Sequence, residues 1–561
     1  MAFEWTEYDR AALEALFFLG HRVGHPDEPI SYPRRASDRP HVAYYGTTRS
    51  GKTFGIEYVL QQLARERSAG FCYIDPHGSS YWRMASFLRQ HDITDRVLFW
   101  DINDAQYIVG YDPFDVPGQS PAYIAGNLTE ALLATLGRPA DAHEQPHLKT
   151  VTDAGLYALL SLGLPFALAG ALFNPGETRI KDAVARQLEE SNLLKIIATL
   201  QRFQDRYHEL AAPYRRLENL FRDDRLRLTF TTPGVNFGEL MDDGWIVLVN
   251  TETKHQTDEA ALLFTRLLVK SLFLAAKERG ATEDPPPFFL AIDEASRYLT
   301  TDTAQILAQT AKFGLYLILG MQSLEQARRE NEETYIAIRS NVNAEVVLRL
   351  SDYDEKLYFA RRFFGDHFDF RSIKHEQVQT AAIPISAEHE TVTHSSPDGP
   401  TRSSSTTELP NGDATTTTTE TYASETLIFG SGYHTEYRYE DVRTPTFFTP
   451  DELERLHAQR FGRRAPGEAN RFGIVRVNEA SPTEIEIPLL DAPLYSRTEM
   501  AEYLGQVKQT QPATLPLIEA QRRSRDLIET HTARLTAAGP DPYTKPRKPR
   551  APRNASKVST D

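Results

Sequence analysis

Short apolar runs alternate along this chain with segments whose apolar residues recur at helical spacing. The runs are Phe71–Ile74, Val97–Trp100, Ile246–Val249, Phe288–Ile292, Leu315–Leu319 and Val346–Leu350. Continuous apolar runs of this length, separated by helices, are typical of parallel strands buried on both faces. The pattern predicts an α/β fold with a mainly parallel sheet, in which ligands bind at the carboxyl ends of the strands.

The strand pattern disappears between residues 119 and 227, where we expect an all-α insertion. Helical spacing is found at Ala122–Leu136, Thr150–Leu162 and Arg179–Phe221. The insertion would divide the α/β domain into residues 41–118 and 228–386. We expect residues 1–40 to form a helical N-terminal segment.

The last third of the chain changes composition twice. Residues 387–424 are rich in Ser and Thr and poor in apolar residues, which predicts a disordered loop. Alternating runs then predict a β-containing extension over residues 425–504. Residues 505–561 are expected to be a flexible tail. Its basic, Pro-rich end could contact phosphates or acidic partners, or could simply keep the protein in solution.

The clearest chemical pattern follows the apolar run Val42–Tyr45 and reads GTTRSGKT, a P-loop. It consists of Gly46, Thr47, Thr48, Arg49, Ser50, Gly51, Lys52 and Thr53. In this pattern the backbone N–H groups surround the phosphates of a nucleotide, the lysine reaches the β and γ phosphates, and the threonine hydroxyl binds Mg²⁺. An amphipathic segment, Phe54–Arg65, follows as the pattern requires. The alternative is an ordinary Gly-rich turn between a strand and a helix.

A P-loop needs a second carboxylate for Mg²⁺ and a group that activates water. The segment FFLAIDEA supplies both after an apolar run, with Asp293 for the metal and Glu294 as general base. Two adjacent acids after a strand also occur as charges that favour a helix N-terminus. Gln322 ends the apolar run of LYLILGMQS and could sense the γ phosphate, or could only cap a loop.

Composition narrows the class of protein. The chain has 561 residues, 40% of them hydrophobic and 25% charged, which is typical of a globular protein of two to four domains. With Cys72 as its one cysteine it cannot form a disulfide within the chain, so we expect a cytoplasmic protein. No apolar stretch is expected to span a membrane.

The net charge is −15, whereas a protein that coats DNA is normally basic. An oligomeric motor can nevertheless restrict its basic residues to a channel. Net charge therefore does not exclude a nucleic-acid partner.

Several motifs recur in the order of a known family. They are the P-loop, Asp75–Gly78, Asp242–Asn250 (DDGWIVLVN), IDEA, Ala311–Gly314 (AKFG), Gln322 and Ser340–Asp352 (SNVNAEVVLRLSD). Together they resemble the HerA/FtsK superfamily of hexameric DNA-pumping ATPases, most closely the conjugative coupling-protein (TraG/TraD-like) branch. The resemblance covers residues 40–385, and residues 429–490 more weakly. It implies a RecA-like P-loop fold with a helical insertion.

The resemblance also implies roles for individual residues. Lys52 and Thr53 would bind ATP and Mg²⁺, Asp293 would be the second metal carboxylate, Glu294 the catalytic base and Gln322 the sensor. Members often place an arginine before Lys-Phe-Gly to act on the neighbouring subunit's nucleotide, whereas this chain has Ala311. Other candidates for that role are Arg297, Lys312, Arg328, Arg329 and Arg339.

Two further departures concern the N-terminus. Coupling proteins usually begin with transmembrane helices, and the HerA type begins with a barrel; the sequence predicts neither here. We expect a ring, with a hexamer as the expected size, that hydrolyses ATP and translocates DNA. The alternatives are a nucleotide-gated recruitment protein that binds ATP without moving DNA, and an ATPase that remodels protein.

Overall fold

The computed structural model describes about three quarters of the chain. The described residues are 16–33, 41–67, 69–133, 146–174, 176–191, 193, 196, 199, 207–279, 285–298, 301–330, 332–365, 373–384, 401–408, 414–421, 437–447, 450–461, 471–477 and 480–537. They form two compact units, residues 1–351 with 464–561, and residues 352–463. The nucleotide-site candidates all lie in the first unit.

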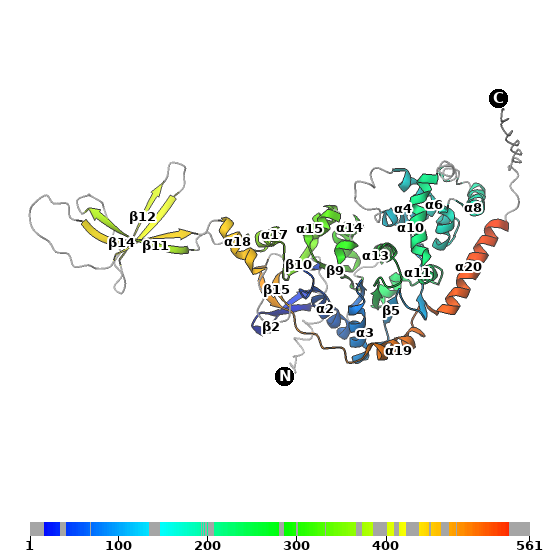
Figure 1. The fold of residues 1–561 in the computed structure, drawn as a ribbon, viewed down its shortest axis with the longest axis horizontal. Helices are drawn as coiled ribbons and strands as arrows, with labels where there is room; N and C mark the ends of the chain where they lie inside the picture. Colours follow the sequence, from blue (N-terminus) through cyan, green and yellow to red (C-terminus); the bar gives the residue numbers. More distant parts are fainter. Residues whose placement is uncertain are drawn as a thin grey trace, which may run out of the picture. The chain divides into compact units, whose positions relative to one another are not determined.

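An 11-stranded mixed sheet forms the core of the first unit (Figure 1). Its order is β2-β1-β16-β15-β10-β3-β9-β8-β4-β7-β5. The strands from β10 to β5 run parallel, and the other four pair antiparallel. The parallel strands are β3 His41–Tyr45, β4 Gly70–Asp75, β5 Val97–Asp101, β7 Ile246–Asn250, β8 Phe288–Ile292, β9 Leu315–Met321 and β10 Val342–Val347.

The predicted fold class is confirmed, because each predicted apolar run lies in or overlaps one of these strands. In β3, β4, β7, β8 and β9 every residue is buried. Burial on both faces explains why these runs are apolar throughout instead of alternating with polar residues. Only the last run is displaced, since β10 ends three residues before Leu350.

Helices pack on this sheet between the strands. They are α2 Lys52–Glu66, α3 Ser79–Gln90, α12 Phe237–Asp242, α13 Asp258–Arg279, η3 Ala295–Arg297, α14 Thr301–Gln309, η4 Thr310–Phe313, α15 Leu324–Glu330 and α16 Glu332–Asn341. Helix α2 contacts β3, β4 and β9, and α3 contacts β4 and β7. The P-loop helix is therefore seated on the middle of the sheet.

The described residues between 119 and 227 contain helices and no strand, as the pattern predicts. They are α4 Pro121–Leu133, α6 Pro146–Ser161, η2 Phe166–Leu168, α7 Ala169–Phe173, α8 Thr178–Glu190, α10 Tyr207–Arg222 and α11 Asp224–Thr229. Helices α4 and α10 pack against α13, which joins the insertion to the sheet domain.

The N-terminal segment differs from the helical expectation. Residues 16–33 form the antiparallel hairpin β1 Leu16–Arg22 and β2 His25–Pro33, turning at Gly24 with φ +76°. Phe17, Leu19 and Tyr32 are fully buried in the main core. The pairing of β1 with β16 favours the strand, since tertiary contacts override weak helix propensity.

The second unit contains two helices and four strands among its described residues. They are α17 Tyr353–Phe364, β11 Ile373–Pro384, β12 Thr401–Glu408, β13 Ala414–Thr421, β14 Tyr437–Phe447 and α18 Pro450–Arg460. The prediction of a disordered loop over 387–424 is wrong at β12 and β13, which pair antiparallel in continuous register. Threonine is β-branched and favours strands, a preference that the low apolar content obscured. The rest of that segment lies outside the described residues.

The prediction of a flexible tail from residue 505 is also wrong for its first part. After β15 Phe472–Val477 and β16 Thr483–Glu486, the chain forms α19 Arg497–Lys508, β17 Thr514–Pro516 and α20 Leu517–Ala537. Strand β17 pairs with β6 Tyr107–Val109, and Ala520 of α20 is buried with Ile108 and Leu228. These contacts with distant segments leave no local signal in the sequence. The basic Pro-rich end lies outside the described residues.

Candidate nucleotide site

The P-loop joins β3 to α2 at the carboxyl edge of the sheet. Gly46 has no room for a side chain, because a Cβ there would lie 2.5 Å from Ser50 Oγ. Gly51, directly before α2, has φ +104°, in the left-handed region that favours glycine. The backbone N–H groups at the start of α2 therefore face an anion-binding position.

The side chain of Lys52 folds back onto the loop and makes hydrogen bonds to its backbone. Lys52 is buried, and its Nζ donates to the carbonyl oxygens of Gly46 at 2.7 Å and Thr47 at 3.1 Å. Burial lowers the pKa of Lys52, while Asp293 and Glu294 oppose the shift. A buried ammonium that donates to carbonyl oxygens of the loop is well suited to exchange them for phosphate oxygens.

Asp293 meets the P-loop helix at its first turn. Thr53 Oγ1 donates to Asp293 Oδ2 at 2.6 Å, and the Glu294 N–H donates to Asp293 Oδ1 at 2.9 Å. The carboxylate has room only because the facing position on β9 is a glycine. A Cβ on Gly320 would lie 2.7 Å from Asp293 Oδ1.

Glu294 and Gln322 are adjacent at the same edge. Gln322 Nε2 donates to Glu294 Oε1 at 2.8 Å, and His77 Nε2 lies 3.0 Å from that oxygen. Glu294 has φ +51° and ψ +40°, a left-handed conformation that costs about 1–3 kcal/mol in a residue other than glycine. Such strain is typical of residues that are held in place at functional sites.

Charge around Glu294 shifts two pKa values in opposite directions. The hydrogen bond with His77 lowers the pKa of Glu294, against the effect of burial. The same bond raises the pKa of His77 above its ordinary value. Glu294 is therefore held as a carboxylate, which is the form that a general base requires.

A buried carboxylate positions the loop that carries His77. Asp75, the last residue of β4, accepts from the backbone N–H groups of His77 at 2.9 Å and Tyr81 at 2.8 Å. Burial raises its pKa, and these two donors oppose the rise. The Asp75–Gly78 motif thus fixes the turn between β4 and α3 beside Glu294.

Three further residues of this site were not assigned to it from the sequence. His77, which belongs to the Asp75–Gly78 motif, is half exposed and contacts Glu294. Gly320 was only a glycine inside an apolar strand, and such a glycine often marks close approach of another group. Arg349 follows β10, the parallel neighbour of β3, and its Nη2 lies 3.4 Å from Thr47 Oγ1. A cation directly after a strand beside the P-loop strand was the available signal.

The candidate arginines for a neighbouring site differ in their surroundings. Arg297 lies 4.0 Å from Glu294 of its own chain. Arg328 pairs with Glu325 of α15 and with Glu332, the first residue of α16, and the side chain of Arg329 is 79% exposed. Helix α15 packs against η3, directly after Glu294, so both of its arginines lie near this end of the site.

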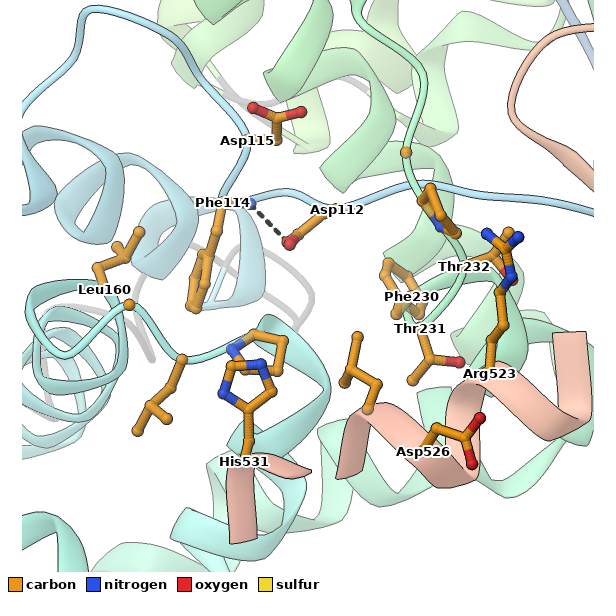
Figure 2. A pocket seen from close by; sticks show the side chains of 16 residues that line it. Asp112, Phe114, Asp115, Leu160, Phe230, Thr231, Thr232, Arg523, Asp526 and His531 are labelled. Carbon is orange, nitrogen blue, oxygen red and sulfur yellow. Dashed lines mark hydrogen bonds between the residues drawn. The ribbon is translucent and has the colours of Figure 1, made fainter. Parts of the chain in front are cut away.

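Among the cavities in the described part of the first unit, two differ in their relation to the P-loop. One, of about 480 Å³, opens beside the P-loop and is lined by Arg49–Phe54 together with residues of α3 and the segment after β16. The other, of about 850 Å³, is drawn in Figure 2. Asp112 and Phe114 lie on one side of it and His531, Asp526 and Arg523 of α20 on the other.

The second cavity lies between α20 and the segment that contains Asp112 and Phe114. Burial raises the pKa of Asp112 to about 6, and the Asp112 carboxylate accepts from the Phe114 N–H at 3.0 Å (Figure 2). None of the residues lining this cavity belongs to the P-loop or to the Asp293–Glu294 pair.

The parallel sheet, the P-loop and the carboxylates that meet it define a fold of the RecA-like P-loop class. Among the described residues no helix has the length and apolar character to cross a bilayer, and no cluster of three or more His, Cys, Asp or Glu residues is arranged to hold a metal by itself.

Comparisons with solved structures find conjugative coupling proteins and a VirB4 protein at low identity. Bacterial conjugative coupling protein TrwB matches with 13% identity and a TM-score of 0.42 over 83% of this chain and 89% of that one. Plasmid coupling protein TrwB in complex with ADP and Mg²⁺ matches with 13% identity, a TM-score of 0.43 and coverage of 81% and 87%. VirB4 of Thermoanaerobacter pseudethanolicus matches with 14% identity, a TM-score of 0.42 and coverage of 64% and 92%.

These likenesses are distant. No family model and no curated protein matches the chain.

Proposed function

We propose that this protein hydrolyses ATP with Mg²⁺ and uses the energy, as a ring of identical subunits, to move DNA. The observation that carries the ATPase assignment is the meeting of four side chains in two contacts at one edge of the sheet, one of which includes the P-loop threonine. Thr53 contacts Asp293, and Gln322 contacts Glu294, across three neighbouring segments of one sheet edge. A mere Gly-rich turn would not need that convergence.

The residues present fit the phosphates and the metal. Thr53 Oγ1 and Asp293 Oδ2 are oxygen donors 2.6 Å apart, and Mg²⁺ prefers oxygen ligands. Lys52 supplies the cation for the β and γ phosphates, and Gly46 keeps the loop free of a side chain. When bound, Mg²⁺ would neutralise charge on the phosphates.

In this proposal Glu294 accepts the proton of the water that attacks the γ phosphorus. Gln322 holds one carboxylate oxygen of Glu294, and its amide reports whether a γ phosphate is present. His77 competes for the same oxygen, so it must release Glu294 before the base can act. Arg349 adds positive charge near Thr47, within the same chain.

The ring and the DNA substrate are supported by the order of the motifs. Exposed Arg329 near the catalytic end offers one cation to an adjoining subunit. In such a ring, hydrolysis at subunit interfaces would alternate closed and open states and pull on the phosphate backbone of DNA, which any sequence can offer.

Activity of purified protein tests the site. We expect Mg²⁺-dependent ATPase activity that DNA stimulates and that Lys52→Ala abolishes. Glu294→Gln should bind ATP normally and hydrolyse it about 100-fold more slowly, since a positioned base contributes about that much. Full activity in Lys52→Ala would overturn the assigned site, and loss of ATP binding in Glu294→Gln would overturn the role of the base.

One observation favours a second candidate, a nucleotide-gated recruitment protein. Glu294 already pairs with His77 and approaches Arg297, an arrangement that would keep turnover slow. Such a switch should hydrolyse ATP at one low rate with or without DNA. Measuring the rate with single- and double-stranded DNA, together with the mass of the particle, separates the two candidates.

A further inference from the structure

A cavity beside the P-loop has an apolar wall that the phosphate chemistry leaves unused. Its lining joins Arg49–Phe54 to Ser79 and Arg83 of α3, to Arg471, and to Pro488–Leu490. Asp293, Glu294 and Gln322 do not line it. The cavity therefore lies at the start of α2, on the side of the P-loop away from Asp293, Glu294 and Gln322.

Two large apolar side chains in this cavity face solvent. Leu489 is 70% exposed and Phe54 is 44% exposed. The Phe54 ring is covered on one side by the Arg83 guanidinium, 5.3 Å from its centroid. Exposed apolar side chains gathered at a concave site are typical of a ligand contact.

The wall is held rigidly over the P-loop helix. Ile487 is fully buried, and its N–H donates to the Arg471 carbonyl at 2.9 Å. A Cβ on Gly55 would lie 3.0 Å from Ile487 Cδ1, so this side chain packs directly on α2. Arg471 in turn pairs with Glu486 at 2.7 Å. Residues 488–490 thus directly follow Ile487, which is anchored next to the start of α2.

We propose that Leu489, together with Phe54, forms the binding wall for the base of the nucleotide. This inference rests on the proposed function. A planar base placed against these side chains would cover apolar surface that water otherwise contacts, and it would add affinity that a phosphate chain alone cannot gain. The C-terminal segment, far from the P-loop in sequence, would then be part of the nucleotide site.

Comparing ATP with tripolyphosphate, which carries the phosphates without a base, tests the wall by calorimetric titration. Leu489→Ser should weaken binding of ATP about 10-fold, the loss expected for one apolar contact, and leave tripolyphosphate affinity unchanged. Leu494→Ser is the matched control, because Leu494 is 67% exposed in the same segment but does not line the cavity. It should change neither affinity.

The fluorescence of an introduced tryptophan provides a second readout. The Leu489→Trp variant should change its fluorescence when ADP binds and show no change with tripolyphosphate. The proposed binding wall would be overturned if Leu489→Ser left the ATP affinity unaltered, or if it weakened the binding of ATP and of tripolyphosphate equally. Lys52→Ala separates the two proposals, since it should weaken both ligands. If it weakens neither, the proposed nucleotide site itself fails.

Discussion

At the scale of single residues, the site depends on the absence of a side chain as much as on the charged groups. Asp293 occupies space that Gly320 leaves open on the adjacent strand. Gly320→Ala should displace the Asp293 carboxylate and weaken the binding of Mg²⁺, while the sheet still forms. We expect a higher Mg²⁺ requirement in ATPase assays.

The matched control for this change is Gly505→Ala on α19. A Cβ there would find its nearest neighbour 4.0 Å away, in ordinary contact distance. Unchanged Mg²⁺ dependence in Gly320→Ala would show that Asp293 does not need this space.

His77 predicts a pH dependence at the same scale. Its pKa lies above the ordinary 6.5 because of Glu294, so the ion pair is fully formed below pH 6.5 and is lost as the pH rises through the raised value. ATPase activity should therefore rise with pH in that window, as Glu294 is released. His77→Gln should make the rate several-fold higher at pH 6 and flatten this rise. A profile identical to that of the wild type would contradict the competition.

At the scale of elements, an ion pair holds α2 against α3. Glu57 is fully buried, and Arg83 Nε donates to both of its carboxylate oxygens, at 3.0 and 3.2 Å. Burial raises the pKa of Glu57, against the effect of Arg83. Arg83→Ala would leave a buried carboxylate without its cation.

We expect Arg83→Ala to lower the free energy of unfolding by about 3 kcal/mol, the loss usual when one partner of a buried pair is removed. Urea denaturation followed by circular dichroism measures it. Replacing both partners, with Glu57→Gln added, should recover part of the loss. No recovery would show that Arg83 acts through packing alone, including its contact with Phe54.

At the scale of the whole molecule, the last described helix ties distant parts of the first unit together. Helix α20 contacts β6, and it also contacts α8 and α11 of the insertion. Lys508, just before it, is buried and pairs with Asp104. The all-α insertion is thus held to the rest of the first unit by α20 as well as by its two chain connections.

Substitutions on two faces of α20 test this docking. Ala520→Asp would bury a charge among Ile108 and Leu228, so limited proteolysis should cut α20 much faster. Ile518→Asp, at a position 81% exposed, should leave the cleavage rate unchanged. Equal rates in both variants would mean that α20 is not docked in solution.

The sequence by itself determined the parallel strands and the P-loop between β3 and α2, because both are local. A buried strand is a continuous apolar run, and GTTRSGKT must keep its residues in order to surround phosphates. Asp293, Glu294 and Gln322 could be predicted for the same reason, since each directly follows a strand of one parallel sheet.

Only the tertiary structure decided which distant residues meet them. Gly320, His77, Arg349 and the wall at Leu489 reach the site through strand order and through the packing of Ile487 on α2. The hairpin at residues 16–33 and helix α20 likewise gain their stability from partners hundreds of residues away. Burial against such partners outweighs local propensity, and a single sequence carries no record of it.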